Sequence, residues 1–287
     1  MSSLVQHIKE LGKIRISLPV ALTTFTGYLM HSGELEPGIL WATLGIFLLS
    51  MGSAMLNHFQ EVHIDKKMPR TQGRPLPAKK IDKSTVFWLI VTFTIGGAGI
   101  LLAGTNVTAM IIGLLTLVWY NLVYTPLKRV TAFAVVPGSM VGALPPVAGW
   151  VAAGGFAFDK FVILLAFFFF IAQIPHFWLL LLKYGHEYEK AGLPSLTKVF
   201  TPKQMRKLTF VWFFATSVTA LLIPFYGIIQ NDFMMILLLI TSVATVATLF
   251  KALIIKDVIK NVGKAFLQIN LYFLSVMIYI WADQLIR

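Results

Sequence analysis

Residues 39–77 read ILWATLGIFLLSMGSAMLNHFQEVHIDKKMPRTQGRPLP, an apolar run that ends in amides, carboxylates, histidines and basic residues. As a helix, the apolar part from about 38 to 60 is long enough to cross the bilayer core, which needs roughly 20 residues. A polar residue such as Asn57 inside an apolar span is costly and usually has a function. The stretch therefore predicts a membrane-spanning helix whose polar end carries a site.

The whole chain has the composition of a membrane protein. Of its 287 residues, 57% are hydrophobic and only 13% are charged, whereas a soluble domain has about 25% charged residues. There is no cysteine, which excludes disulfides, thiolate metal sites and a cysteine nucleophile. In a soluble protein, a net charge of +12 would suggest nucleic-acid binding. In a membrane protein, the positions of the basic residues instead indicate which segments face the cytoplasm. The lipid bilayer, and not nucleic acid, is the expected partner.

Apolar stretches long enough to span a bilayer recur along the whole chain, which predicts an all-α polytopic membrane protein with one domain over residues 1–287. Glycines and prolines between 137 and 149 predict a bent helix inside the bundle. The nine predicted spans lie near 15–31, 38–60, 84–103, 105–124, 131–152, 160–182, 207–228, 233–251 and 265–284.

The positions of the basic residues predict the topology. With the N-terminus in the cytoplasm, all of the 24 lysines and arginines except Lys160 and Arg287 fall in cytoplasmic segments. The positive-inside rule therefore favours nine spans with the C-terminus outside. The expected location is a bacterial-type inner (plasma) membrane. The two long connections, at about 61–83 and 183–206, face the cytoplasm, and long loops often carry function.

Acidic and amide side chains gather at the end of the second span. Asn57, Glu61 and Asp65 are spaced i, i+4, i+8 and would stack on one helix face if the span continues as helix. Two carboxylates and an amide suit Mg²⁺, which is commonly bound together with substrate phosphates. Arg70 and Arg74 follow and could hold those phosphates. By spacing alone, the two carboxylates could equally be ordinary interface charges.

A second cluster lies in residues 173–188, QIPHFWLLLLKYGHEY. Lys183 and Glu187 are i, i+4 at the cytoplasmic end of the sixth span, so both long connections begin with acidic and basic groups. Facing each other, the two groups would form one polar chamber above an apolar bundle. His176 lies deep in the apolar segment, where a histidine is more often a hydrogen-bonded structural residue than a ligand.

Residues 119–129, WYNLVYTPLKR, place aromatic and basic groups near the same interface. Tyr120 and Tyr124 are i, i+4 and precede Lys128. An aromatic belt with flanking cations explains this pattern without any site, although Asn121 fits that explanation less well.

At these residues the chain resembles the UbiA superfamily of intramembrane prenyltransferases, and within it the haem O synthase (protoheme IX farnesyltransferase) branch. The resemblance covers nearly the whole chain and implies a fold of nine transmembrane helices around a central cavity. Glu61 and Glu187 stand where the family usually has aspartate. The matching segments, in order, are NHFQEVHIDKKMPRTQGRPLP, YTPLKR, GALPPVAGW, PHFW and EYEKAGLPSL.

The resemblance implies a Mg²⁺-dependent transfer of the farnesyl group of farnesyl diphosphate to a vinyl group of haem B. It implies that Mg²⁺ is bound through Asn57, Glu61 and Asp65, opposite Glu187. Tyr120 or Tyr124 would shelter the allylic cation through its ring face, and His176 becomes a candidate haem ligand. The candidates for holding the diphosphate oxygens are Arg70, Arg74, Lys128 and Lys183.

Two alternatives stay open. The same machinery could prenylate another aromatic or quinone-precursor acceptor, although GALPPVAGW and PHFW argue against it. The chain could also be a non-enzymatic transporter, but a transporter would place acidic residues near the bilayer midplane and not at helix ends.

Overall fold

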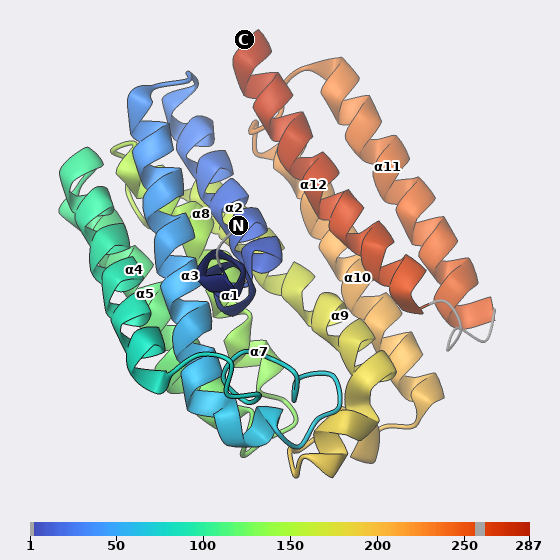
Figure 1. Cartoon of the computed structure of the whole chain (residues 1–287). Helices are drawn as coiled ribbons and strands as arrows, with labels where there is room; N and C mark the ends of the chain where they lie inside the picture. Colours follow the sequence, from blue (N-terminus) through green and yellow to red (C-terminus); the bar gives the residue numbers. More distant parts are fainter. Residues whose placement is uncertain (1–2, 256–261) are drawn as a thin grey trace.

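The computed structural model describes residues 3–255 and 262–287, and these residues form helices without any strand (Figure 1). Lys256 and Lys260, counted above among the cytoplasmic charges, lie outside the described residues. The longer helices are α1 (Ser3–Leu11), α2 (Ile14–Ser32), α3 (Pro37–Asp65), α4 (Lys83–Gly104), α5 (Val107–Val118), α8 (Met140–Ala152), α9 (Lys160–Lys190), α10 (Pro202–Phe225), α11 (Asp232–Phe250) and α12 (Val262–Ile286).

Within the described ranges, eight helical segments are long and apolar enough to cross a membrane. They match eight of the nine predicted spans. The remaining prediction, 15–31, falls on α2, a helix of 19 residues and hence about 28 Å long. Its arginine, histidine, serines and threonines lower its hydropathy, so α2 is not one of the eight. A ninth crossing stays a prediction.

The helices pack as two neighbouring groups (Figure 1). One contains α2, α3, α4, α5 and α8, and the other contains α9, α10, α11 and α12; α8 against α9 and α2 against α12 join them. Glycines bring α2 and α8 close together. A Cβ on Gly27 would lie 1.9 Å from the carbonyl oxygen of Pro146, and one on Gly149 would lie 1.9 Å from that of Thr24. Small residues permit such close approach of membrane helices.

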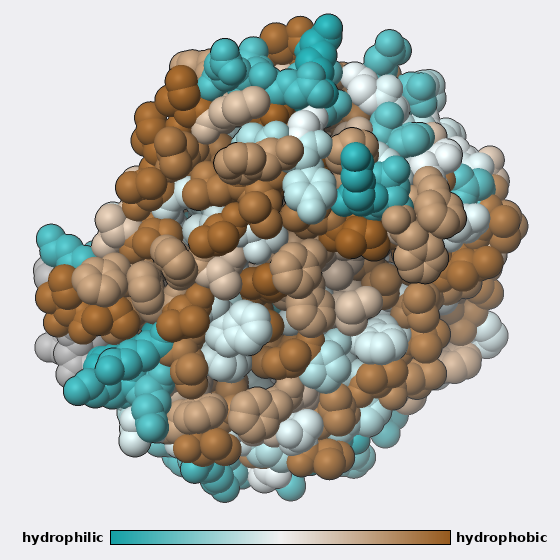
Figure 2. Space-filling model, turned by 180° about the vertical axis from the view of Figure 1, so that it is seen from behind, coloured by the Kyte–Doolittle hydropathy of each residue, from teal (hydrophilic) through white to brown (hydrophobic). Residues whose placement is uncertain are grey.

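The outer surface is that of an integral membrane protein. Figure 2 shows apolar side chains over most of the middle of one face, with hydrophilic side chains gathered toward its upper and lower ends. Large apolar side chains such as Trp88 on α4 and Ile240 on α11 are exposed at 63% and 56%. Lipid tails are as apolar as these side chains, so their exposure costs little in a bilayer.

Three short elements interrupt the predicted spans near one end of the bundle. The 105–124 span continues from α5 into a π-helix, η1 (Trp119–Tyr124), and then into α6 (Thr125–Leu127). The 131–152 span, predicted as one bent helix, is divided at Ser139 into α7 (Val135–Gly138) and α8.

The predicted start of the second long connection is wrong. The helix α9 does not end near 182 but continues to Lys190. Lys183 and Glu187 therefore lie on its last turns, and the connection to α10 covers only 191–201. It contains a 3₁₀ turn, η2 (Leu196–Lys198). This connection and segment 66–82 lie at the same end of the bundle, opposite the C-terminus (Figure 1).

Candidate active site

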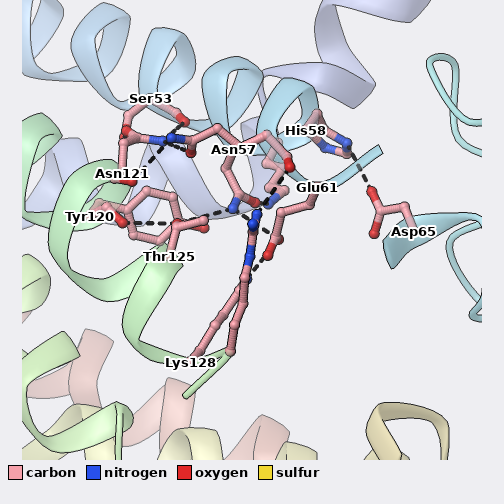
Figure 3. A network of polar contacts seen from close by, with 12 residues as sticks. Ser53, Asn57, His58, Glu61, Asp65, Tyr120, Asn121, Thr125 and Lys128 are labelled. Carbon is pink, nitrogen blue, oxygen red and sulfur yellow. Dashed lines mark hydrogen bonds and ion pairs between the residues drawn. The ribbon is translucent and has the colours of Figure 1, made fainter. Parts of the chain in front are cut away.

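The C-terminal end of α3 carries the predicted row of oxygen groups. The helix continues unbroken to Asp65, and Asn57, Glu61 and Asp65 are buried, with exposed fractions of 2%, 6% and 2%. Asn57 Nδ2 donates to Glu61 Oε2 at 2.9 Å (Figure 3). The expectation that they share one helix face is therefore confirmed.

Each of these three acceptors receives a hydrogen bond from a basic side chain of a different segment. The three donors come from the α1–α2 junction, from the end of α6 and from segment 66–82. The pairs are Lys13 Nζ to Asn57 Oδ1 at 2.9 Å, Lys128 Nζ to Glu61 Oε2 at 2.6 Å, and Arg74 Nη1 to Asp65 Oδ1 and Oδ2 at 3.0 and 2.9 Å. We call these six side chains the α3 charge cluster.

Lys13 was not predicted as a site residue, because a lysine just before a span is normally counted as a topology signal. Its backbone has φ 45° and ψ 53°, the left-handed region that residues other than glycine rarely adopt. Burial, and then the charges of Arg74 and Lys128, lower the pKa of Lys13 from 10.5 to about 7. Burial is the larger cause, because it disfavours the charged form of the amine, and the two neighbouring cations add to it.

The π-helix η1 positions Lys128 through a polar network on α3. Asn121 is fully buried; its Nδ2 donates to the Ser53 carbonyl at 3.1 Å, and its Oδ1 accepts from Ser53 Oγ at 2.6 Å. Gln60 completes the network by donating to the Asn121 carbonyl at 3.1 Å. Such π-bulges are frequent at functional sites. One turn later, Thr125 accepts from Asn57 at 3.3 Å (Figure 3).

Tyr120 and Tyr124 face the protein and not only the lipid boundary. Their rings stack with centroids 5.6 Å apart, and Tyr124 also meets Phe177 of α9 at 6.1 Å. Lys128 Nζ lies 5.6 Å from the Tyr124 ring centroid. These contacts place the pair beside the α3 charge cluster, so an aromatic belt alone does not account for it.

Segment 66–82 reaches the end of α9. The guanidinium carbon of Arg70 lies 4.9 Å from the ring centroid of Tyr184, and Lys183 Nζ lies 5.0 Å from the same ring. The predicted meeting of the two polar segments is therefore seen at Tyr184. Arg70 and Lys183 are both exposed, so they lie at the rim, whereas Arg74 and Lys128 lie in the α3 charge cluster.

Two carboxylate oxygens in this region lack a hydrogen-bond partner among the described residues, although they are buried: Glu61 Oε1 and Glu187 Oε2. In the same part of the chain, no three His, Asp or Glu side chains lie close enough together to hold a metal ion. Glu187 therefore does not join Glu61 and Asp65 in a preformed acidic cage. Whether it acts as a metal ligand stays a prediction.

Two further histidines bear on the site, His176 on α9 and His58 on α3. His176 packs against the ring of Phe266 on α12, with the ring centroids 4.4 Å apart. Its role as a haem ligand stays a prediction. His58, which the sequence did not single out, is buried at 1%, and neither ring nitrogen has a hydrogen-bond partner among the described residues. Its Nδ1 lies 3.7 Å from Asp65 Oδ2 (Figure 3).

Residues 20–275 match the model of the UbiA prenyltransferase family. The chain belongs to this family. It is 30% identical over 283 residues to the protoheme IX farnesyltransferase of Oleidesulfovibrio alaskensis, and the alignment covers 99% of this chain and 98% of that one. The family assignment makes the chain a prenyltransferase and confirms the resemblance seen in its motifs.

Solved structures of other UbiA proteins have the same fold. A digeranylgeranylglyceryl phosphate synthase superposes with a TM-score of 0.76 at 17% identity, covering 99% of both chains. A UbiA homolog from Archaeoglobus fulgidus, solved with GPP and Mg²⁺, superposes with a TM-score of 0.67 at 13% identity, covering 94% of this chain and 99% of that one. The all-α, UbiA-like prediction is thus confirmed.

Proposed function

We propose that this UbiA protein transfers the farnesyl group of farnesyl diphosphate to a vinyl group of haem B, giving haem O. The observation that carries the proposal is the near full-length alignment to a relative named protoheme IX farnesyltransferase. In the reaction, the allylic C–O bond breaks, diphosphate leaves, and farnesyl C1 bonds to the terminal vinyl carbon. Water then supplies the hydroxyl group of the new hydroxyethylfarnesyl side chain.

The basic residues bind the diphosphate end of the substrate. Lys128 and Arg74 lie within hydrogen-bond reach of the α3 carboxylates, so they can turn from these to diphosphate oxygens with small movements. Arg70 and Lys183 supply further positive charge at the rim. Preorganised cations stabilise the negative charge that develops on the leaving group. The farnesyl tail extends among the apolar side chains of the bundle.

The oxygen groups fit Mg²⁺, as judged from the unpartnered Glu61 Oε1 and Glu187 Oε2. Carboxylate and amide oxygens are the donors that Mg²⁺ prefers, and Asn57, Glu61 and Asp65 would hold it, with Glu187 opposite. When bound, the ion would neutralise the diphosphate and lower the barrier to its departure. The Archaeoglobus relative, whose structure contains GPP and Mg²⁺, supports this assignment.

The aromatic pair protects the reacting carbon. The stacked rings of Tyr120 and Tyr124 present π faces next to the cluster, and such faces stabilise a cation by up to about 2 kcal/mol when desolvated. They also keep water away from the allylic cation until the acceptor attacks it. His176 of α9, whose ring packs against Phe266 of α12, is our candidate for holding the haem iron.

The test uses purified protein with farnesyl diphosphate, Mg²⁺ and haem B. Mass spectrometry of the extracted pigment should show a haem in which one vinyl group has become a hydroxyethylfarnesyl group, that is, a gain of one farnesyl group and one hydroxyl group. A folded protein that leaves haem B unchanged but prenylates an aromatic acid or quinone precursor would replace the haem acceptor by the alternative one. Failure to consume a prenyl diphosphate with any acceptor would refute prenyl transfer.

A further inference from the structure

The α3 charge cluster contains more basic groups than acidic groups. Its two carboxylates, on Glu61 and Asp65, face three basic side chains, on Lys13, Arg74 and Lys128. Lys128 and Arg74 each pair with a carboxylate. Among the described residues, Lys13 donates to a neutral group, the amide oxygen of Asn57, at 2.9 Å, and to no carboxylate.

The position of Lys13 is costly to the protein. Its left-handed backbone stores strain, and such strain is concentrated at functional sites. The ordinary place for a lysine at the start of a membrane helix is the water-facing boundary. Lys9, one turn earlier on α1, is exposed in that way. Lys13 instead points inward, to Asn57 on α3.

The pairing has a consequence for binding. A bare divalent cation must displace Lys13 from Asn57 and then remain near the positive charges of Arg74 and Lys128, which repel it. A diphosphate brings enough negative charge to reverse that repulsion and offers Lys13 new acceptor oxygens. Metal and diphosphate therefore help each other to bind, whereas the metal alone is disfavoured.

We propose that Lys13 excludes metal from the site until diphosphate arrives, and that it then moves from Asn57 Oδ1 to a diphosphate oxygen. This inference rests on the proposed function for the identity of the two ligands. It makes Lys13 a positioning residue for Asn57 in the ligand-free state and a binding residue in the loaded state. It also means that prenyl diphosphate enters together with its metal ion.

The test measures binding to the whole purified protein by isothermal titration calorimetry, using Mg²⁺ alone and Mg²⁺ with inorganic pyrophosphate. For the wild type, pyrophosphate should tighten Mg²⁺ binding at least about tenfold, the scale of one charge-assisted hydrogen bond. Lys13→Met should tighten the binding of Mg²⁺ alone by about tenfold and reduce the effect of pyrophosphate. Lys9→Met removes the same charge from an exposed position and should behave as wild type.

A second variant guards against misfolding. Lys13→Gly removes the amine and also relieves the left-handed strain, because glycine adopts that conformation freely. Both variants should bind Mg²⁺ alike if the amine excludes the metal. The inference would be overturned if the wild type and the two Lys13 variants bound Mg²⁺ alone with equal affinity. It would also be overturned if pyrophosphate left the Mg²⁺ affinity of the wild type unchanged.

Failure of the proposed function gives a different pattern. These titrations need neither a prenyl chain nor an acceptor. Mg²⁺–pyrophosphate synergy without farnesyl transfer would refute only the function, whereas transfer without any role of Lys13 in Mg²⁺ binding would refute only the inference.

Discussion

Lys128 Nζ donates to Glu61 Oε2 at 2.6 Å, although the two residues are 67 positions apart in the chain. The contact ties the end of α3 to the segment that follows η1 and brings two motifs of the sequence into one site. Lys128 is partly exposed at 19% of its side chain, whereas Glu61 is 8% exposed. The lysine can therefore leave the carboxylate toward a ligand, but the carboxylate is fixed.

Lys128→Met should weaken the binding of farnesyl diphosphate while changing the stability of the fold less. The loss of one hydrogen bond to a charged group corresponds to about 1.5–3 kcal/mol, or roughly a tenfold to hundredfold rise in KM. Steady-state kinetics with varied farnesyl diphosphate measures this. Arg129→Met, at the next and exposed position, is the matched control and should raise KM much less. If both substitutions raised KM equally, the loss of affinity would come from the general positive charge of the surface and not from a specific contact of Lys128.

Asp65→Asn should abolish prenyl transfer, with a rate at least about a hundredfold lower, while the protein stays folded in the membrane. The amide keeps the size of the side chain and can still accept from Arg74, but it lacks the charge that the metal ion needs. Activity assays and detergent melting curves measure the two properties separately. Asp82→Asn is the control, because Asp82 is an exposed residue before α4. Full activity of Asp65→Asn would refute the proposed metal site.

Glu61→Asp restores the residue that the family usually has at this position and should keep substantial activity. The shorter side chain cannot hold both Asn57 and Lys128 at their present distances of 2.9 and 2.6 Å. We therefore expect a several-fold change in the Mg²⁺ dependence of the reaction and little change in kcat at saturating metal. A complete loss of activity would show that the site depends on the longer glutamate.

Helical periodicity predicted the positions of the α3 side chains, because an i, i+4, i+8 row stays on one face wherever the helix is placed. The same reasoning could not predict Lys13, whose role depends on how the α1–α2 junction folds against α3. It also missed η1, because an apolar segment has the same hydropathy pattern in an α- or a π-register. The end of α9 was missed because polar residues after 182 resemble a loop while still forming helix.

Topology can be tested by cysteine labelling, since the chain contains no native cysteine. Cysteines at Gln72 and Lys198, both exposed in the two polar connections, should react with a membrane-impermeant reagent only from the cytoplasmic side. A cysteine at Glu34, which is exposed in the connection between α2 and α3, should react only from the other side. This last result also decides whether α2 crosses the membrane as the ninth span.

Packing of α2 against α8 should tolerate no side chain at Gly149. A Cβ there would lie 1.9 Å from the Thr24 carbonyl oxygen, and backbone cannot move aside without separating the helices. Gly149→Ala should lower the melting temperature or prevent folding. Gly96→Ala is the control, because nothing lies within 4 Å of its Cβ position, and there alanine should be neutral or stabilising by up to about 1 kcal/mol. Equal melting temperatures would disprove the close contact.

Asn121→Val tests whether the polar network on α3 positions the active site. The change removes the hydrogen bonds of Asn121 with Ser53 and Gln60 and leaves buried polar groups without partners, at a cost of about 1–3 kcal/mol each. Because Thr125 and Lys128 follow directly, the turn that carries them should shift, and kcat/KM should fall further than stability alone explains.

Thr116→Val, on the neighbouring α5, loses only a bond to the Ile112 carbonyl and is the control. Measurements well below the melting temperature of each variant separate the two effects. If Asn121→Val lowers the melting temperature but leaves kcat/KM unchanged, the network stabilises the fold without positioning Lys128.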